Sequence, residues 1–281
     1  MNAVVFYSNT CQSKAIATYF ANQLGYPLAD METKCAEHYQ NLVLVFPVHC
    51  QNIPAIVKVF LKNISVDNLT VIATYGKMCC GNVLCEIQKN YQKNIVAGAY
   101  IPTKHSYIDN DDIFCDFDKL KLIVEKVKEP SYIQLPKLYK NPLADIFPKL
   151  RSRLGLTIQR SADCGGCNLC AERCSFGAIQ SGITNRKCIR CLKCVEACPR
   201  QALKIKLGLP LKLYLRKKKT NELIIYVWMI CFRKLLKNQV QMMISTYKNE
   251  TFWSFHPHFW PFFIPFGVLT HIENVVCLTR K

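Results

Sequence analysis

Eight cysteines between residues 164 and 198 have the clearest capacity for chemistry in this sequence. They fall into two runs that share the spacing Cys-x-x-Cys-x-x-Cys-x-x-x-Cys, and each cysteine of the first run recurs 24 residues later. The runs are Cys164, Cys167, Cys170 and Cys174, then Cys188, Cys191, Cys194 and Cys198. Three thiolates in one tight loop can reach three corners of an iron–sulfur cubane, whereas the fourth points away. The repeat therefore predicts two [4Fe–4S] clusters.

The same geometry assigns the ligands, because the fourth cysteine of each run must bind the other cluster. We call the two predicted sets site 1 and site 2. Site 1 consists of Cys164, Cys167, Cys170 and Cys198. Site 2 consists of Cys188, Cys191, Cys194 and Cys174. Structural zinc is the alternative, but zinc sites separate their Cys-x-x-Cys pairs by longer gaps than these runs do.

The composition of the chain indicates the compartment and the kinds of partner that this chemistry would have. The chain has 281 residues, 17 cysteines and a formal net charge of +18. The start of the sequence does not resemble a signal peptide, and metal-ligand runs suit a reducing cytoplasm better than a disulfide framework. The other nine cysteines are interpreted as small buried or inert side chains. The charge favours acidic partners, nucleic acid or anionic membranes, but no nucleic-acid-binding motif accompanies it.

Residues 1–150 alternate short apolar runs with amphipathic ones. Strands are predicted at 3–7, 27–31, 42–46, 69–74 and 95–99. Helices are predicted at 13–24, 53–61, 83–91 and 112–128. Such alternation is typical of a doubly wound α/β fold, here a five-stranded parallel sheet with helices on both faces. Ligands of such sheets bind at loops that follow the carboxyl ends of strands.

Three loops occupy that position, at residues 7–14, 46–54 and 74–82. With them, residues 1–150 resemble a flavodoxin-like domain, and residues 164–204 resemble a small α+β bacterial-type two-cluster ferredoxin. Their order is that of the fused flavodoxin–ferredoxin family. The resemblance implies a linker at 151–163 and leaves residues 205–281 unassigned.

The resemblance implies FMN as a further cofactor. In the family the first loop wraps the FMN phosphate, and the matching positions here are Ser8, Asn9, Thr10, Gln12 and Ser13. Asn9 and Cys11 stand where the family pattern has glycines. An ordinary capped strand-to-helix turn is the alternative interpretation, because Ser and Thr are common helix caps.

The other two loops would lie beside and over the flavin ring. The second contributes Pro47 and His49, and the third contributes Thr74, Tyr75 and Gly76. A solvated loop histidine and a tyrosine that caps the core are the alternatives for His49 and Tyr75.

Two functions remain open, and a third is weaker. The first is an electron carrier between redox partner proteins, with no catalytic residue of its own. The second is a flavin-dependent oxidoreductase fed by the clusters, and the third is a ferredoxin with a flavin-free docking domain. Only residues 102–107 could form a substrate-binding insertion, and their shortness favours the carrier. The sequence shows no Gly-x-Gly-x-x-Gly fingerprint, so direct reduction by a nicotinamide is not expected.

Residues 205–281 form a basic aromatic tail of unknown role. They hold all three tryptophans and twelve Lys or Arg against three Asp or Glu. The apolar run at 223–232 is too short to span a bilayer. A peripheral membrane anchor, a docking surface for an acidic partner and a poorly packed extension are the open alternatives.

Overall fold

The computed structural model describes residues 1–108, 113–146, 155–216 and 220–227. All of these belong to one compact unit, Met1–Trp228. Within the tail, residues 217–219 and 228–281, which include all three tryptophans, lie outside the described residues. The membrane and partner roles considered for that part of the tail therefore stay predictions.

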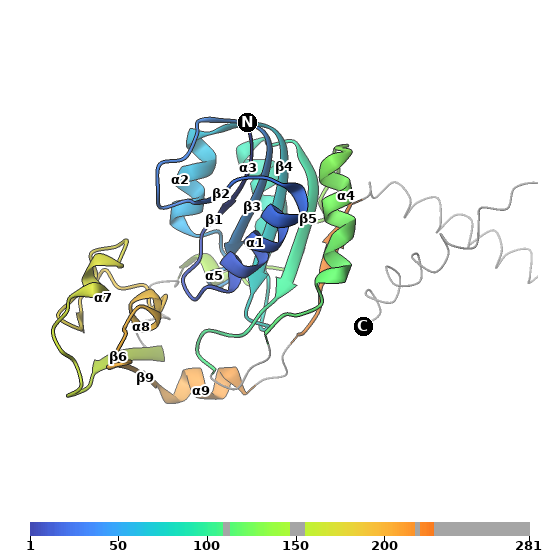
Figure 1. Cartoon of the computed structure of the whole chain (residues 1–281). Helices are drawn as coiled ribbons and strands as arrows, with labels where there is room; N and C mark the ends of the chain where they lie inside the picture. Colours follow the sequence, from blue (N-terminus) through green and yellow to red (C-terminus); the bar gives the residue numbers. More distant parts are fainter. Residues whose placement is uncertain (109–112, 147–154, 217–219, 228–281) are drawn as a thin grey trace, which may run out of the picture. The chain divides into compact units, whose positions relative to one another are not determined.

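A six-stranded sheet, mostly parallel, forms the centre of the fold (Figure 1). Its strands are β1 (Asn2–Phe6), β2 (Leu28–Asp30), β3 (His38–Pro47), β4 (Ser65–Tyr75), β5 (Ile95–Pro102) and β10 (Ile224–Tyr226). The order across the sheet is β10-β5-β4-β3-β1-β2, and only β10 runs antiparallel to its neighbour. The parallel α/β architecture predicted from the sequence is confirmed.

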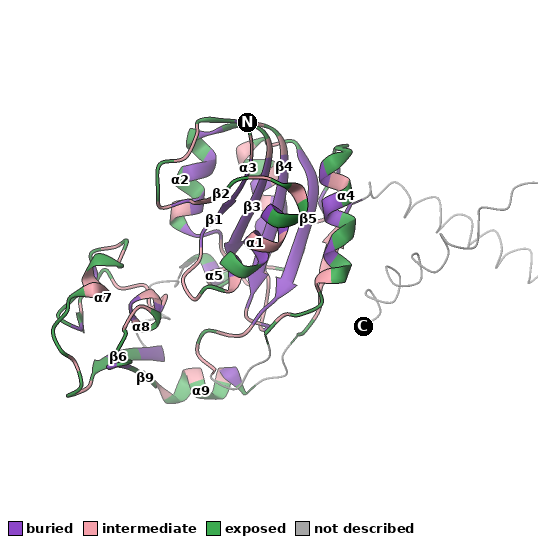
Figure 2. Cartoon of the chain, in the orientation of Figure 1, coloured by how far each residue is buried: buried purple, intermediate pink, exposed green. Residues whose placement is uncertain are grey.

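Helices cover both faces of this sheet because successive strand residues point to opposite faces. The helices are α1 (Gln12–Leu24), α2 (Ala55–Asn63), α3 (Val83–Tyr91) and α4 (Lys121–Lys128). On β1, Val4 and Phe6 pack with α1 and α4, whereas Ala3 and Val5 belong to the core that α2 and α3 cover. Figure 2 shows the strands buried between helices whose outer sides are exposed.

The closing helix is shorter than the sequence predicts. Residues 113–116 are not helical, and a single 3-10 turn, Phe117–Leu120, precedes α4. Phe114 packs edge-on against Phe117, with ring centroids 5.4 Å apart, and both contact the core under α1 and α4. The predicted helix over 112–128 is therefore wrong for residues 113–116, and residue 112 lies outside the described residues.

The predicted number of strands is also wrong, because β10 adds a sixth strand from within the basic tail. Ile224, Ile225 and Tyr226 pair with Tyr100, Ala99 and Gly98 of β5. Ile225 packs on the side of α1 and α4, whereas Ile224 and Tyr226 pack on the other side. The apolar run that begins at Leu223 thus starts by closing an otherwise open edge of the sheet.

The hydroxyl of Tyr75, at the end of β4, anchors the segment that leads into β10. It lies 2.6 Å from the carbonyl oxygen of Glu222 and accepts the Glu222 N–H at 3.2 Å. We expect Tyr75→Phe to lower the free energy of unfolding by about 1–2 kcal/mol, because the partly buried peptide groups of Glu222 lose their partner. Chemical denaturation measures this, with Tyr139→Phe on an exposed ring as the control. Equal losses in the two variants would contradict this anchoring role.

The cysteine-bearing portion is small and mixed α+β. Its strands are β6 (Leu156–Arg160), β7 (Ile179–Gln180), β8 (Ile183–Thr184) and β9 (Leu203–Leu207). Its helices are α7 (Leu169–Glu172), α8 (Lys193–Glu196) and α9 (Leu209–Leu215), and α5 (Leu143–Ile146) lies in the preceding segment. The antiparallel pairs β6–β9 and β7–β8 enclose a small core that includes Ile158, Ile179 and Leu203.

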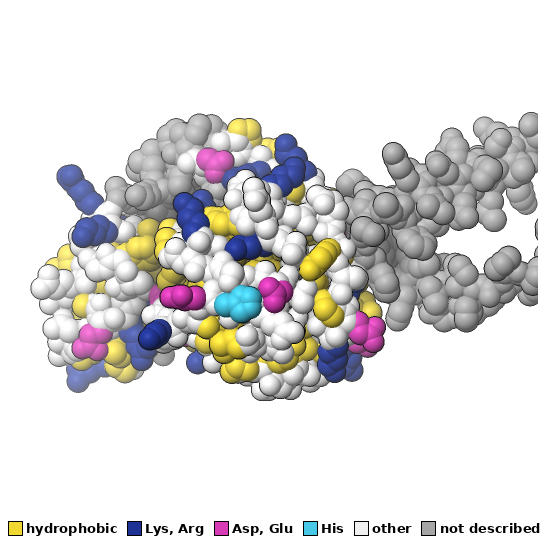
Figure 3. Space-filling model, turned by 90° about the horizontal axis from the view of Figure 1, so that it is seen from above, with side chains coloured by type: hydrophobic (Ala, Val, Ile, Leu, Met, Phe, Trp, Pro, Cys, Tyr) yellow, Lys and Arg dark blue, Asp and Glu magenta, His cyan; other side chains and the backbone are white. Residues whose placement is uncertain are grey.

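The surface carries scattered charge. On the face drawn in Figure 3, Lys and Arg side chains are interspersed with acidic and hydrophobic ones. Exposed ion pairs such as Lys119–Asp116 (2.6 Å) contribute little to stability, because water screens them. Within the described ranges, no helix combines the length and the apolar character needed to cross a bilayer.

Candidate functional site

The sequence repeat is also a repeat of backbone geometry. Three positions in or just after each cysteine run have positive φ, and they match at an offset of 24 residues. The pairs are Gly166 and Arg190 (71° and 61°), Asn168 and Leu192 (58° and 65°), and Gly177 and Gln201 (54° and 47°). Non-glycine residues adopt this region at a cost of about 1–3 kcal/mol each, so the surrounding loop must impose it. The two runs thus fold alike although their loop residues differ.

The fourth cysteine of each run occupies the same environment. The N–H of Ala178 donates to Sγ of Cys174 at 3.3 Å, and the N–H of Ala202 donates to Sγ of Cys198 at 3.3 Å. Both alanines are buried, which explains why the sequence repeats a small residue there. Amide donors to sulfur favour the thiolate form and help to set the potential of a bound cluster.

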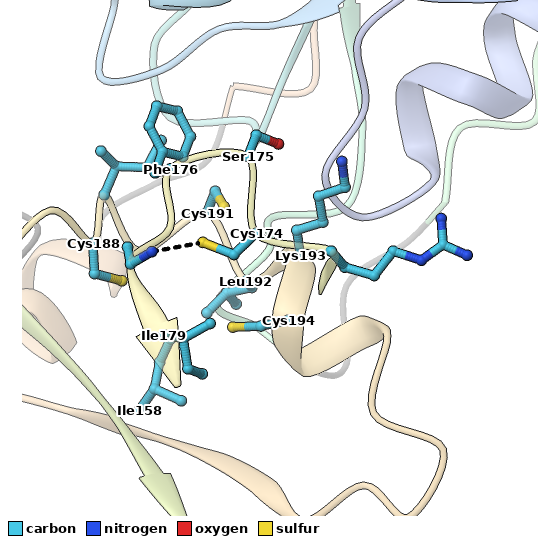
Figure 4. A pocket seen from close by; sticks show the side chains of 13 residues that line it. Ile158, Cys174, Ser175, Phe176, Ile179, Cys188, Cys191, Leu192, Lys193 and Cys194 are labelled. Carbon is cyan, nitrogen blue, oxygen red and sulfur yellow. Dashed lines mark hydrogen bonds between the residues drawn. The ribbon is translucent and has the colours of Figure 1, made fainter. Parts of the chain in front are cut away.

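The four cysteines predicted for site 2 line a single cavity. Figure 4 shows Cys174, Cys188, Cys191 and Cys194 around it, with the apolar side chains of Ile158, Ile179 and Leu192 completing its wall. Cys174 comes from the first run and the other three from the second run. The structure therefore brings together the crossed set that the spacing predicts, although which cysteines bind iron stays a prediction.

Electrostatics in this cavity suit a cationic centre. Burial, followed by the charges of Cys191, Cys188 and Cys174, raises the pKa of Cys194 to about 12. Burial also raises the pKa of Cys191, although the backbone N–H of Lys193 opposes that shift. Neighbouring thiols that resist ionisation alone become thiolates when metal ions supply positive charge. These residues fit a [4Fe–4S] cluster.

The cysteines of site 1 are less enclosed. Cys167 is exposed, and Cys170 and Cys198 are partly buried against the small core. Gly165 makes room for Arg200, because a Cβ built at this glycine would lie 2.6 Å from a guanidinium nitrogen. Among the described residues, no three His, Cys, Asp or Glu side chains gather closely enough to hold a single metal ion.

The first of the three sheet-edge loops contains buried polar atoms that lack partners. Oγ of Ser8 and Oδ1 of Asn9 are buried and find no hydrogen-bond partner among the described residues. The loop leads into α1, whose N-cap, Cys11, is left-handed at φ 58° and supplies no side-chain cap. Cysteine thus takes a left-handed conformation, which glycine adopts most easily, whereas Asn9 has no positive φ. Unpartnered groups beside a helix N-terminus fit a phosphate.

Asn9 is held by His49 of the second loop. Nδ2 of Asn9 lies 3.0 Å from Nε2 of His49, and burial lowers the pKa of His49 to about 4. His49 is therefore neutral at pH 7, and its Nε2 accepts the amide proton. With the amide turned over, Nε2–H would donate to Oδ1 and Nδ2 would serve the phosphate instead. His49 thus orients the loop in either arrangement.

Ser13 and Thr74, predicted from different loops, contact each other. Their hydroxyl oxygens are 2.9 Å apart and both residues are buried. Their hydrogen bond ties the start of α1 to the end of β4. Thr10 and Gln12 are partly exposed in the first loop, and Pro47 is partly exposed at the end of β3.

The second and third loops are braced against each other. Cys50 and Gln51 both have positive φ, and His49 and Asn52 exchange backbone hydrogen bonds across this tight turn. Gly81 lies directly against Gln51. Gly76 lies against His105, so the third loop also contacts the loop after β5. Tyr75 points its hydroxyl at Glu222, as described above.

Four residues with no motif of their own also belong to this region. Tyr107 and Glu32, which follow strands of the main sheet, contact the site 2 loops through Arg190 and Lys193. Spacing gave no signal for them, because each contact joins segments more than eighty residues apart in sequence.

Comparisons with known proteins support a 4Fe-4S binding domain in part of the cysteine region. No curated protein sequence matches the chain. Among solved structures, a candidate flavoprotein from Bacteroides uniformis ATCC 8492 is similar at 15% identity and a TM-score of 0.30, over 38% of this chain and 92% of that one. The model of the 4Fe-4S binding domain family matches residues 183–204, which include Cys188, Cys191, Cys194 and Cys198. The chain therefore contains a 4Fe-4S binding domain at residues 183–204.

Proposed function

We propose that this chain is an electron-transfer protein that holds two [4Fe–4S] clusters and one FMN and passes electrons between redox partner proteins. The observation that carries the proposal is the cavity of site 2, where cysteines from both runs meet. Three of these four cysteines lie within the match to the 4Fe-4S binding domain. The crossed arrangement links the two runs into one electron-transfer unit.

The cofactors supply one-electron exchange at the clusters and one- or two-electron exchange at the flavin. The chain supplies their surroundings. The amides of Ala178 and Ala202 donate to sulfur, and the apolar wall of site 2 keeps water from the cluster. A less hydrated cluster that accepts more amide bonds has a different potential from an exposed one. Site 1 and site 2 should therefore differ in potential.

The FMN part of the proposal rests on the first loop. Ser8 offers a buried hydroxyl with no partner among the described residues, next to the amides that begin α1. Asn9 and His49 form a neutral pair beside it. We propose the carrier over an enzyme because Tyr107 of the only candidate insertion contacts the cysteine portion. Membrane contact through the tail stays a secondary proposal, and nucleic acid is not expected as a partner.

Counting iron and flavin in one anaerobically purified sample tests this function. About eight irons and about one FMN per chain are expected. About eight irons with no flavin, even after FMN is added, would leave a two-cluster protein whose α/β portion serves for docking. Zinc in place of iron would contradict the central claim.

Ser8→Ala isolates the phosphate contact. Loss of one hydroxyl donor to a charged phosphate should weaken FMN binding about tenfold. Quenching of flavin fluorescence on titration into flavin-free protein measures the affinity. Thr18→Ala is the control, because it removes a hydroxyl within α1 that donates to the carbonyl oxygen of Lys14. If Ser8→Ala binds FMN as tightly as the parent protein, the phosphate lies elsewhere.

A further inference from the structure

We propose that site 2, and not site 1, faces the flavin loops, and that Tyr107 and Glu32 are the positioning residues that hold it there. This inference rests on the proposed function, and it adds the order in which the two clusters and the flavin would exchange electrons. Electrons would pass between a partner and site 1, then between site 1 and site 2, and then between site 2 and the flavin.

Tyr107 provides the first contact. Its hydroxyl donates to the carbonyl oxygen of Arg190 at 2.8 Å, and Arg190 immediately precedes the site 2 ligand Cys191. The ring packs against the small core that includes Leu192 and Cys194. Tyr107 thus lies on the segment that follows β5 of the main sheet, and its side chain contacts the loop that carries three of the four site 2 cysteines.

Tyr107 is also linked to the flavin loops, through His105. Its ring packs edge-on against His105, with centroids 5.2 Å apart, and its N–H donates to Nδ1 of His105 at 3.1 Å. His105 in turn lies against Gly76 of the third loop, where any side chain would overlap the imidazole. A chain of packed groups therefore runs from the third loop to site 2.

Glu32 provides a second, independent contact. Its carboxylate pairs with Nζ of Lys193 and bonds the hydroxyl of Ser175. Lys193 immediately precedes Cys194 and Ser175 immediately follows Cys174, so both partners flank site 2 ligands. The side chains of Glu32 and Lys193 are each 19% exposed, so water screens this pair less than a surface pair. None of these contacts involves a residue next to a site 1 cysteine.

The phosphate loop lies near site 2 as well. The N–H of Met31, the residue before Glu32, donates to the carbonyl oxygen of Phe6 at 2.8 Å, and Phe6 immediately precedes that loop. The contact of Glu32 with Lys193 and Ser175 therefore starts one residue from the strand that carries the loop. By contrast, Cys167 of site 1 is exposed, and Gly165 and Gly166 beside it are exposed too. Site 1 is thus the centre open to an external partner.

The electrons balance in this order. With both clusters and FMN bound, a low-potential one-electron donor outside the chain would be oxidised as site 1 accepted its electron. That electron would pass to site 2 and then to the flavin, so each cluster would be reduced once and reoxidised once. Two such passages, with two protons from solvent, would supply the two electrons that complete reduction of one FMN requires.

Paramagnetic broadening of amide NMR signals tests which site faces the loops, whether or not FMN binds. In the iron-loaded protein, amide signals of residues 7–13 should be broadened by the nearby cluster. Cys194→Ala, which removes site 2, should restore them, whereas Cys167→Ala, which removes site 1, should not. Restoration by Cys167→Ala, or unbroadened signals in the parent protein, would overturn the inference. Iron counts on the same samples test the proposed function separately.

A double variant that keeps every cysteine tests the two positioning residues. Tyr107→Phe with Glu32→Gln should retain all iron and should speed hydrogen exchange of the α8 amides about tenfold, because both contacts restrain that loop. The loop signals should also sharpen, which a merely local loosening of α8 would not cause. Tyr139→Phe with Glu129→Gln, at exposed positions, is the matched control. Unchanged exchange and unchanged broadening in the double variant would refute the role of Tyr107 and Glu32.

Discussion

Replacing Cys174 by alanine is expected to halve the iron content of the anaerobically purified protein, from about eight atoms per chain to about four. The variant should also lose the same cluster that Cys194→Ala loses, although Cys174 lies in the other run. The reason is geometric: Cys174 lines one cavity with Cys188, Cys191 and Cys194. The remaining cluster should therefore give the same electron paramagnetic resonance spectrum in both variants.

Cys170→Ala is the matched control for this experiment, because it lies only four residues earlier in the same run. It should also leave about four irons, but with the other spectrum. Cys115→Ala, at an exposed position outside both runs, should keep all iron. If Cys174→Ala and Cys170→Ala left the same cluster, each run would bind its own cluster and the crossed assignment would be wrong.

Gly81→Ala should be the most damaging single substitution in the flavin loops. Gly81 has φ +66°, and a Cβ built there would lie 2.6 Å from the carbonyl oxygen of Gln51. Left-handed backbone alone costs an alanine about 1–2 kcal/mol, and the overlap with a turn that is itself fixed should bring the total loss of unfolding free energy to about 3 kcal/mol or more. Denaturation by urea measures this loss.

Gly25→Ala separates the two causes. Gly25 ends α1 with the same φ of +66°, but a Cβ there would meet nothing within 4 Å. Its variant should lose only the backbone cost, about 1–2 kcal/mol. The difference between the two variants measures the overlap with Gln51. Equal losses would show that the second loop moves aside freely, and the described bracing of the loops would then be wrong.

The parallel sheet could be predicted from sequence because its strands are long apolar runs separated by helical periods. Residues 42–46, for example, are buried on both faces of the sheet, and a short continuous apolar run is typical of such a strand. The sixth strand could not be predicted in this way. Three residues, 224–226, are too few to show a strand pattern in the sequence. Their pairing with β5 joins segments that are far apart along the chain.

In the candidate sites too, features set by local sequence spacing could be predicted, whereas contacts between distant segments could not. The spacing of the two runs predicted the four site 2 cysteines, three from the second run and Cys174 from the first, and the structure places all four around one cavity. The flavin positions came from a resemblance, and the structure gives Ser8 and Asn9 unpartnered polar atoms while it ties Ser13 to Thr74 and Tyr75 to Glu222. Glu32 and Tyr107 could not be found, because their partners follow more than eighty residues later.

The pairing of β10 with β5 has a consequence for how the protein folds. Since β5 ends at Pro102 and β10 begins at Ile224, about 120 residues must be closed into a loop before this edge forms, at an entropy cost that grows with the logarithm of loop length. Folding of the cysteine portion shortens the free part of that loop. Ribosomal synthesis also delivers β10 last of the six strands. Metal loading and completion of the sheet edge should therefore favour each other, so that a protein starved of iron exposes the edge of β5.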